Sequence, residues 1–209
     1  EIACAIVFCI FTFAYLFFYQ ADLLTMEQHV LSDGLTKYNR TIGAVIITAI
    51  LLLLQQGVDA ATKRTIKMPA LTYFPPAMLL AMLTDISPSI DHGYSIGKWA
   101  WLAPLLLTAW GGAAYVSARH KDSDSPKQKT IVQTIWENIL AMTALYIFIG
   151  ATANTDRVFH ERMKMEVMVA EGKYKDALNV KTSKADKDST ITMLRAYALA
   201  REGKMGERL

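Results

Sequence analysis

Five long apolar stretches occupy most of the first three quarters of this 209-residue chain, and they restrict its fold more than any other feature. A helix needs roughly 20 mostly apolar residues to cross a hydrocarbon core about 30 Å thick, because lipid offers no partner to an unpaired backbone amide. The sequence therefore predicts an all-α fold, a polytopic transmembrane helix bundle with about five spans. The expected spans are residues 2–19, 42–58, 68–84, 99–118 and 135–153.

Charge is concentrated after the last apolar stretch. Residues 1–152 hold 10 Lys and Arg and 10 Asp and Glu, whereas residues 153–209 hold the other 12 and 9, so the C-terminal part carries the whole net charge of +3. We therefore divide the chain into a transmembrane domain, 1–153, and a polar tail, 154–209. The composition, with 53% apolar residues and two cysteines, excludes a disordered chain, a disulfide scaffold and a collagen-like fibre.

The third expected span, residues 68–84, is the least regular one because it contains Pro69, Pro75 and Pro76. A proline pair removes two amide donors and clashes with the preceding turn, so the helix must break or kink. One interpretation is a kink that neighbouring helices relieve, and we favour it. The other is a broken helix that lines a cavity or a substrate path.

Basic residues in the short loops predict the orientation of the spans. Seven follow the second and fourth spans, against three in the loops after the first and third. The seven are Lys63, Arg64, Lys67, Arg119, Lys121, Lys127 and Lys129, and the three are Lys37, Arg40 and Lys98. This alternation places the N-terminus inside, and the 21–41 loop, the 85–98 loop and the tail outside.

The tail shows helical periodicity and an internal repeat. Apolar residues recur there at steps of three and four, which gathers them on one helix face: Val158, Phe159, Met163, Val167 and Ala170. Gly172 then permits a turn before a second helix. Residues 170–178 align with residues 201–209 at an offset of 31, with Glu, Gly, Lys and Leu matched.

The segment from Glu171 to Leu178 resembles the turn and second helix of a tetratricopeptide repeat (TPR), in which a glycine, an aromatic residue two positions later and an Ala-Leu pair recur. The resemblance implies a TPR-like helical-hairpin tail that binds a protein or peptide partner, with Tyr174, Leu178 and Tyr197 in the packing and interaction region. It also implies further repeats beyond Leu209, since such units need about three copies for stability. A plain helical hairpin packed on the membrane part is the alternative.

The cluster of spans, the loop from Tyr19 to Ser32 and the repeat-bearing tail together resemble an uncharacterised family of bacterial multi-pass envelope proteins. That resemblance implies a bacterial inner-membrane protein whose tail is periplasmic. We expect the lipid bilayer and an envelope protein or peptide as partners, and the expected function is an interaction or assembly scaffold.

Carboxylates in the expected outer loops suggest an alternative function. Asp22 follows the first span, Asp85 ends the third, and Asp91 and His92 come soon after. In multi-span glycosyltransferases that use lipid-linked donors, an acid in the first outer loop acts as general base or metal ligand, and the position of Asp22 resembles that arrangement. The alternative is therefore a glycosyl- or phosphoryl-group transferase. Both Asp22 and Asp85 also suit a purely structural role at a helix end.

The remaining motifs predict no further chemistry. No phosphate loop, nucleophile elbow or metal-ligand spacing is present in the sequence, Cys4 and Cys9 have no histidine neighbours, and the tail has no basic face for nucleic acid. We expect no cofactor and no metal. Glu137 would be an interfacial acid if the fifth helix starts near Trp136, which we favour, or an intramembrane acid if it starts at Thr130. A transporter would need more intramembrane polarity than these spans offer.

Overall fold

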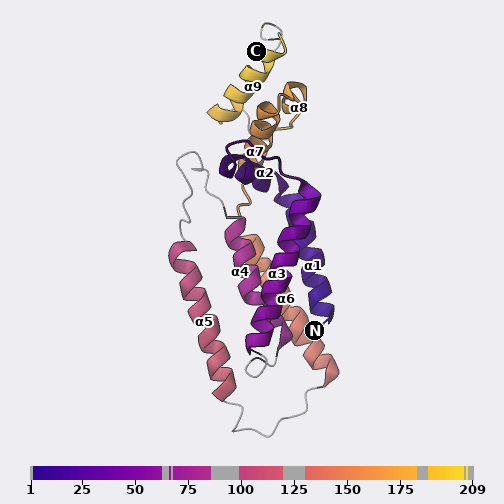
Figure 1. The fold of residues 1–209 in the computed structure, drawn as a ribbon, viewed down its shortest axis with the longest axis vertical. Coiled ribbons are helices and arrows are strands. Elements are labelled where there is room, and N and C mark those ends of the chain that lie inside the picture. The colour runs from indigo at the N-terminus through magenta and orange to yellow at the C-terminus, as the bar shows by residue number, and fades with distance from the viewer. Residues whose placement is uncertain are drawn as a thin grey trace. The chain divides into compact units, whose positions relative to one another are not determined.

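The computed structural model describes residues 2–62, 66, 68–85, 99–119, 130–182, 188–204 and 206. Every element in these ranges is helical, which confirms the all-α class, and Figure 1 shows the succession of helices. The chain forms two compact units. Unit 1 comprises residues 1–17 and 41–154, and unit 2 comprises residues 18–40 and 155–209.

Three of the described helical stretches are long and apolar enough to cross a membrane: Ile2–Tyr19, Arg40–Thr62 and Ile131–Thr152. The first stretch consists of α1 (Ile2–Ala14) and the π-helical turn η1 (Tyr15–Tyr19). The second is α3 (Arg40–Thr62), and the third is α6 (Ile131–Thr152). They correspond to the first, second and fifth expected spans. The third expected span is a shorter apolar helix, and the fourth, α5 (Trp99–Arg119), contains Pro104 and falls outside this set.

The third expected span is broken as its prolines require. A 3₁₀ helix, η2 (Pro69–Tyr73), leads directly into α4 (Phe74–Leu83), and each begins with proline in its first turn. Proline is tolerated there because the first amides of a helix have no intrahelical acceptor, and its φ angle already suits a helix. The prolines therefore start two short helices instead of kinking one long helix.

Side chains from three other helices complete the hydrogen bonds of this broken segment. Asn138 Oδ1 of α6 accepts from the amide of Ala70 at 3.0 Å, and the indole of Trp110 in α5 donates to the carbonyl of Leu71 at 3.1 Å. The Gln55 amide of α3 donates to the Thr72 hydroxyl at 2.9 Å. Unpaired backbone groups are costly at membrane depth, so these contacts stabilise the break. Neighbouring helices thus support the segment, as in the favoured interpretation, but they do so at a break between two helices and not at a kink in one.

Aromatic contacts and small residues form the interior of unit 1. The ring of Phe11 in α1 stacks on Tyr146 of α6 with centroids 3.9 Å apart, and Phe8 packs against Tyr73 of η2 at 5.0 Å. Ala77 and Leu80 of α4 are fully buried, as α4 packs closely along α6. Unit 1 is thus held together by contacts of α1, η2 and α4 with α6.

The helix α6 begins earlier than we expected. It runs from Ile131 to Thr152, with Thr130 as its cap, whereas the simpler interpretation of the sequence starts it near Trp136. Glu137 therefore lies in the second turn of the helix and is half-buried. The expected helix start near Trp136 is wrong, so Glu137 is not an N-terminal acid of this helix. The neighbouring Asn138 explains the polarity at this point, because its amide completes the backbone of η2.

Unit 2 combines a loop and the tail. The loop contributes α2 (Ala21–Leu31), and the tail contributes α7 (Arg157–Ala170), α8 (Tyr174–Leu178) and α9 (Ser189–Arg201). Helix α2 packs on α7, which in turn packs on α8 and α9. The two units therefore cut across the division at residue 153, because residues 18–40 belong with the tail.

The helices α7 and α9 begin and end in the same way. Asp156 and Asp188 cap them, with side-chain oxygens that accept from the amides of Val158 and Thr190 at 2.9 Å. Each helix ends at a glycine with positive φ, and the turns are closed by the bonds from the Lys173 amide to the Met168 carbonyl and from the Lys204 amide to the Leu199 carbonyl. Gly172 and Gly203 have φ of 73° and 72°. The glycine turns thus repeat in conformation at the offset of 31 found in the sequence, whereas the capped helix starts are 32 residues apart.

Candidate functional site

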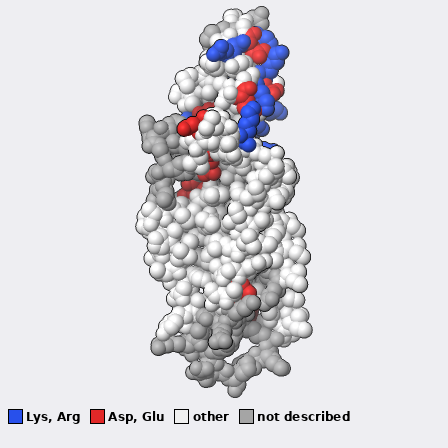
Figure 2. All heavy atoms as spheres, in the orientation of Figure 1, with Lys and Arg blue, Asp and Glu red and all other residues white. Residues whose placement is uncertain are grey.

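Among the described residues, most of the charged side chains belong to unit 2. Figure 2 shows Lys, Arg, Asp and Glu gathered over α7, α8 and α9, whereas the visible face of the unit 1 helices is almost uncharged. Exposed apolar side chains are frequent in the candidate spans, with Ile2 78% and Ile10 64% exposed. The candidate sites within the described part of the chain are therefore sought in unit 2.

An aromatic and cationic cluster joins α8 to α9. The rings of Tyr174 and Tyr197 meet edge to face, with centroids 6.1 Å apart and planes at 68°. The Arg201 guanidinium lies over the Tyr197 ring, 5.2 Å from its centroid, and donates to the phenol oxygen at 2.8 and 3.0 Å. This hydrogen bond raises the pKa of Arg201 above its ordinary value, so the group stays charged. Leu178, the third residue expected here, is half-buried at the end of α8.

One face of α9 carries exposed large side chains, whereas large apolar side chains of α7 are buried. On α7, Phe159 and Met165 are 4% and 0% exposed, and α2, α8 and α9 all pack on that helix. On α9, Met193 and Tyr197 are 64% and 43% exposed, and the offset of 31 matches them with Arg162 and Glu166, which form an ion pair on α7. The α9 face (Met193, Tyr197, Arg201) is therefore an exposed helical surface, which α8 contacts through the ring of Tyr174.

The second helix of the hairpin is short. α8 has five residues, compared with 14 in α7 and 13 in α9. Its Ala177 is fully buried and fills the small-residue position that the TPR resemblance assigns to it. The tail therefore relies on the two long helices, α7 and α9, and on the Gly172 turn that joins α7 to α8.

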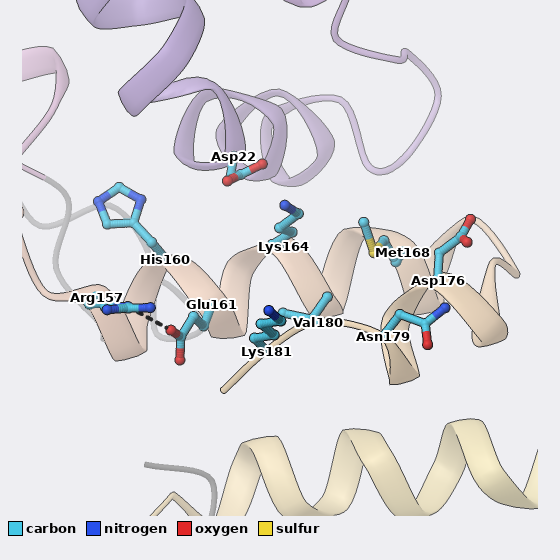
Figure 3. A pocket seen from close by; sticks show the side chains of 10 residues that line it. All are labelled: Asp22, Arg157, His160, Glu161, Lys164, Met168, Asp176, Asn179, Val180 and Lys181. Atoms are coloured by element: carbon cyan, nitrogen blue, oxygen red, sulfur yellow. Dashed lines mark hydrogen bonds and ion pairs between the residues drawn. The ribbon is translucent and has the colours of Figure 1, made fainter. Parts of the chain in front are cut away.

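A charged pocket of about 550 Å³ lies between α2, α7 and the segment that follows α8 (Figure 3). Ten residues line it: Asp22, Arg157, His160, Glu161, Lys164, Met168, Asp176, Asn179, Val180 and Lys181. The five from α7 recur at helical spacing and so form one stripe along that helix. This volume is within the range typical of small-molecule sites.

Two of the carboxylates in this charged pocket already have cationic partners. Asp22 lies 3.6 Å from the Arg40 guanidinium, and Glu161 accepts from Arg157 Nε at 3.0 Å. Lys164 and Lys181 have neither an ion pair nor a side-chain hydrogen bond within the described ranges. The charge left for a ligand in the pocket is therefore mainly cationic.

The two predicted catalytic residues that the structure describes belong to different units. Asp22 is in unit 2 and pairs with Arg40, whereas Asp85 is in unit 1, where it accepts from the Trp99 indole at 2.7 Å. Asp91 and His92 lie outside the described residues. Within the described ranges, no group of three or more His, Cys, Asp and Glu side chains could hold a metal ion.

A second cavity, of about 210 Å³, lies between the C-terminal half of α2, the loop after it and the end of α7. Tyr38 lines it, and its hydroxyl is buried without a hydrogen-bond partner among the described residues. Burial, and then the nearby Glu27 carboxylate, raise the pKa of Tyr38. At the rim, a hydrogen bond from Lys173 at 2.6 Å lowers the pKa of Glu171 and raises that of the lysine.

Comparison with known protein families, curated proteins and solved structures finds no match to this chain.

Sequence reasoning missed the cationic residues of the charged pocket. Residues 157, 160, 161, 164 and 168 follow helical spacing, so the sequence does contain the signal for a polar stripe on one face of α7. It contains no signal for the opposite wall, because Asp22 is more than 130 residues away from that stripe in the chain. Packing of α2 on α7 creates the pocket.

Proposed function

We propose that this chain is a membrane-anchored interaction module whose second unit docks an amphipathic helix of a partner protein on the α9 face. The exposure of Met193 and Tyr197, one helical turn apart on α9 and in line with Arg201, carries this proposal. Ile191, Ala198 and Leu199 of the same helix are buried, and α9 packs on α7 and α8. The packing within this unit thus offers an example of the helix that such a face would bind, one with an edge of small and branched apolar residues.

Charge adds selectivity to this surface. Arg201 is exposed beside Tyr197, and Lys204 is exposed at the end of the same helix. A partner helix with an apolar edge and acidic flanking residues would complement both features. Tyr and Arg are also the residue types that most often dominate the binding energy of interfaces.

Unit 2 is built from two segments, the loop after the first span and the tail. This supports a topology in which the 21–41 loop and the tail share one side of a membrane. Both segments pack in one compact unit, so the chain between them must cross an even number of times. The helices α3 and α6 provide two crossings, and α4 and α5 then both cross or both do not. This agrees with the distribution of basic loops, and we propose an inner-membrane location in bacteria with the tail in the periplasm.

Cysteine accessibility tests this topology. With Cys4 and Cys9 replaced by serine, single cysteines at Leu35, in the loop, and Ser189, in the tail, should both react with an impermeant maleimide added outside intact cells. Both positions are exposed. Labelling of Ser189→Cys only after the membrane is opened would reject the periplasmic tail.

Photocrosslinking tests the docking function. A photoreactive amino acid at Met193 in the full chain, in native membranes, should give one discrete protein adduct, and Tyr197→Ser in the same chain should abolish it. The matched control is the same photoreactive group at Val30, an exposed apolar position on α2. Equal adducts from both positions, or adducts insensitive to Tyr197→Ser, would contradict the proposal.

The transferase hypothesis has less support and stays a prediction of the sequence. Its leading residue, Asp22, is held by Arg40, and its second acid, Asp85, belongs to the other unit. Asp22→Asn in the full chain tests it, since loss of an envelope-glycan phenotype at unchanged protein level would require that carboxylate.

A further inference from the structure

We propose that the charged pocket of unit 2 binds a phosphate group at the point where the chain leaves the membrane. This inference goes beyond the docking function of the α9 face and uses different residues. It assigns a ligand to the pocket between α2, α7 and the segment after α8, for which the sequence predicted only a catalytic acid.

The balance of charge in the pocket favours an anion. Arg40 offsets Asp22 from outside the pocket, and Arg157 offsets Glu161 within it. Lys164 and Lys181 then face a single remaining carboxylate, Asp176, at the α8 end. A phosphate group would gain contacts with two ammonium groups that have no ion-pair partner among the described residues. Lysine is a common phosphate ligand that acts as a point charge.

The two lysines come from different elements, which makes the pocket more than a charged helix face. Lys164 projects from the third turn of α7 on the side of α2, and Lys181 follows α8 (Figure 3). The backbone links them, since α7 and α8 pack together across the Gly172 turn. A ligand between them would contact both α7 and the segment that follows α8.

One wall of the pocket meets the end of a candidate span. Tyr19 is the last residue of the apolar stretch Ile2–Tyr19, and its ring lies 5.4 Å from the ring of His160, which lines the pocket. Tyrosine at the end of a span sits at the level of the lipid headgroups. The pocket therefore opens near the layer in which lipid phosphates are concentrated. An anionic lipid headgroup and a free phosphate ion share the chemistry that the lysines recognise.

Native mass spectrometry of the full chain in detergent tests the proposal. The probes are phosphatidylglycerol, zwitterionic phosphatidylcholine and inorganic phosphate, each titrated against the wild type and Lys164→Ala/Lys181→Ala. Because a lysine near an anionic lipid contributes about 1 kcal/mol, the double variant should bind the anionic probe roughly tenfold or more weakly. The matched control is Lys175→Ala/Lys204→Ala, which removes the same charge from exposed lysines of unit 2 outside the pocket.

Each outcome decides the proposal. Binding of phosphatidylglycerol that the pocket variant loses and the control keeps supports a lipid source, and the same pattern with inorganic phosphate alone supports a soluble source. Equal losses in the two double variants would show unspecific attraction to a cationic unit and overturn the proposal, as would absence of binding to either anion. Thermal unfolding of both variants, expected within about 1 °C of each other, excludes misfolding as the cause of a difference.

Discussion

Polar side chains serve opposite purposes in the two units. In unit 1, Gln55, Trp110 and Asn138 all end on the broken segment of residues 69–73. Asn138 accepts from the Ala70 amide, Trp110 adds a second donor to the Leu71 carbonyl, and Gln55 donates to the Thr72 hydroxyl. In unit 2, Lys164 and Lys181 line a pocket and have no ion-pair partner within the described ranges. These three polar side chains of unit 1 support the fold, whereas the two lysines of unit 2 are available to the solvent.

The surrounding medium explains this difference. An unpaired polar group in hydrocarbon costs several kcal/mol, so a hydrogen-bond partner stabilises a polar side chain such as Gln55 or Asn138 in a span. A lysine ammonium group in water is solvated, so the fold loses no stability when this group has no protein partner. Such a lysine can therefore bind a ligand. Polar residues in the spans of a membrane chain are therefore weak evidence of function until their partners are known.

The largest effect is expected for Asn138→Leu, which removes the acceptor of the Ala70 amide. Ala70 is 3% exposed, so its N–H would be left buried and unpaired. The free energy of unfolding should fall by about 1–3 kcal/mol. Thermal unfolding in detergent, followed by tryptophan fluorescence, measures the change.

The matched control for Asn138→Leu is Thr143→Val, on the same helix. The Thr143 hydroxyl donates only to the Ile139 carbonyl within the helix among the described contacts, so its loss should change stability by no more than about 0.5 kcal/mol. Equal losses for the two variants would mean that Asn138 does not repair the break.

A smaller effect is expected for the pair of Gln55 and Thr72. Thr72→Val leaves the buried Gln55 amide without its acceptor and should cost about 1–2 kcal/mol. The double change Gln55→Leu/Thr72→Val removes both polar groups, so it should cost less than the sum of the two single changes. A double-mutant cycle of unfolding free energies measures this coupling, and strict additivity would show that the hydrogen bond contributes nothing.

The sequence predicted most of the helices but not how they group. Hydropathy and prolines suffice for Ile2–Tyr19, for α3 and for the break at residues 69–75, because these depend on local composition. The sequence predicts the start of α6 too late, because the polar residues Glu137 and Asn138 are typical of a membrane interface. The contact of Asn138 with the Ala70 amide, which accounts for its polarity, has no signal in the sequence.

The candidate sites were predictable in part, for a related reason. Glycine and aromatic spacing indicated the Tyr174 and Tyr197 region, and the two rings do meet. The charged pocket depends on α2 packing against α7, a contact between segments more than 100 residues apart, and no local pattern indicates it. Asp22 was singled out as an acid, yet its neighbours Arg40 and Lys164 define its surroundings.

Substitution of one glycine in each unit should change the free energy of unfolding by up to about 1 kcal/mol, in opposite directions. Gly172 has a φ of 73° and closes the turn after α7, so Gly172→Ala should destabilise unit 2 by about 1 kcal/mol through backbone strain alone. Gly57 lies inside α3 with open space around it, so Gly57→Ala should stabilise unit 1 by a few tenths to 1 kcal/mol through helix propensity.

Unfolding of the two glycine variants in detergent should therefore shift in opposite directions. Native-state hydrogen exchange assigns each shift to its unit, with Gly172→Ala speeding exchange in residues 157–178. The same sign for both substitutions would contradict the assignment of Gly172 to a turn that needs positive φ.

The smallest effect is expected at Tyr38, whose buried hydroxyl has no hydrogen-bond partner within the described ranges. At neutral pH, Tyr38→Phe should change stability by only a few tenths of a kcal/mol, because no hydrogen bond is lost. At high pH the two proteins should differ. Burial and Glu27 raise the pKa of Tyr38 in the folded state, so the unfolded chain loses this proton first, near its ordinary value of 10.0, and the wild type loses stability as the pH rises beyond that value.

Tyr38→Phe removes that contribution, so its unfolding midpoint should fall less steeply between about pH 9.5 and 11. The comparison is made between the two proteins at each pH, because lysines throughout the chain also titrate in this range and affect both alike. Parallel curves over the whole range would show that water reaches the Tyr38 phenol in the folded state. Tyr38 would then resemble Lys164 and Lys181 of the same unit, and not a buried polar group such as Gln55 of unit 1.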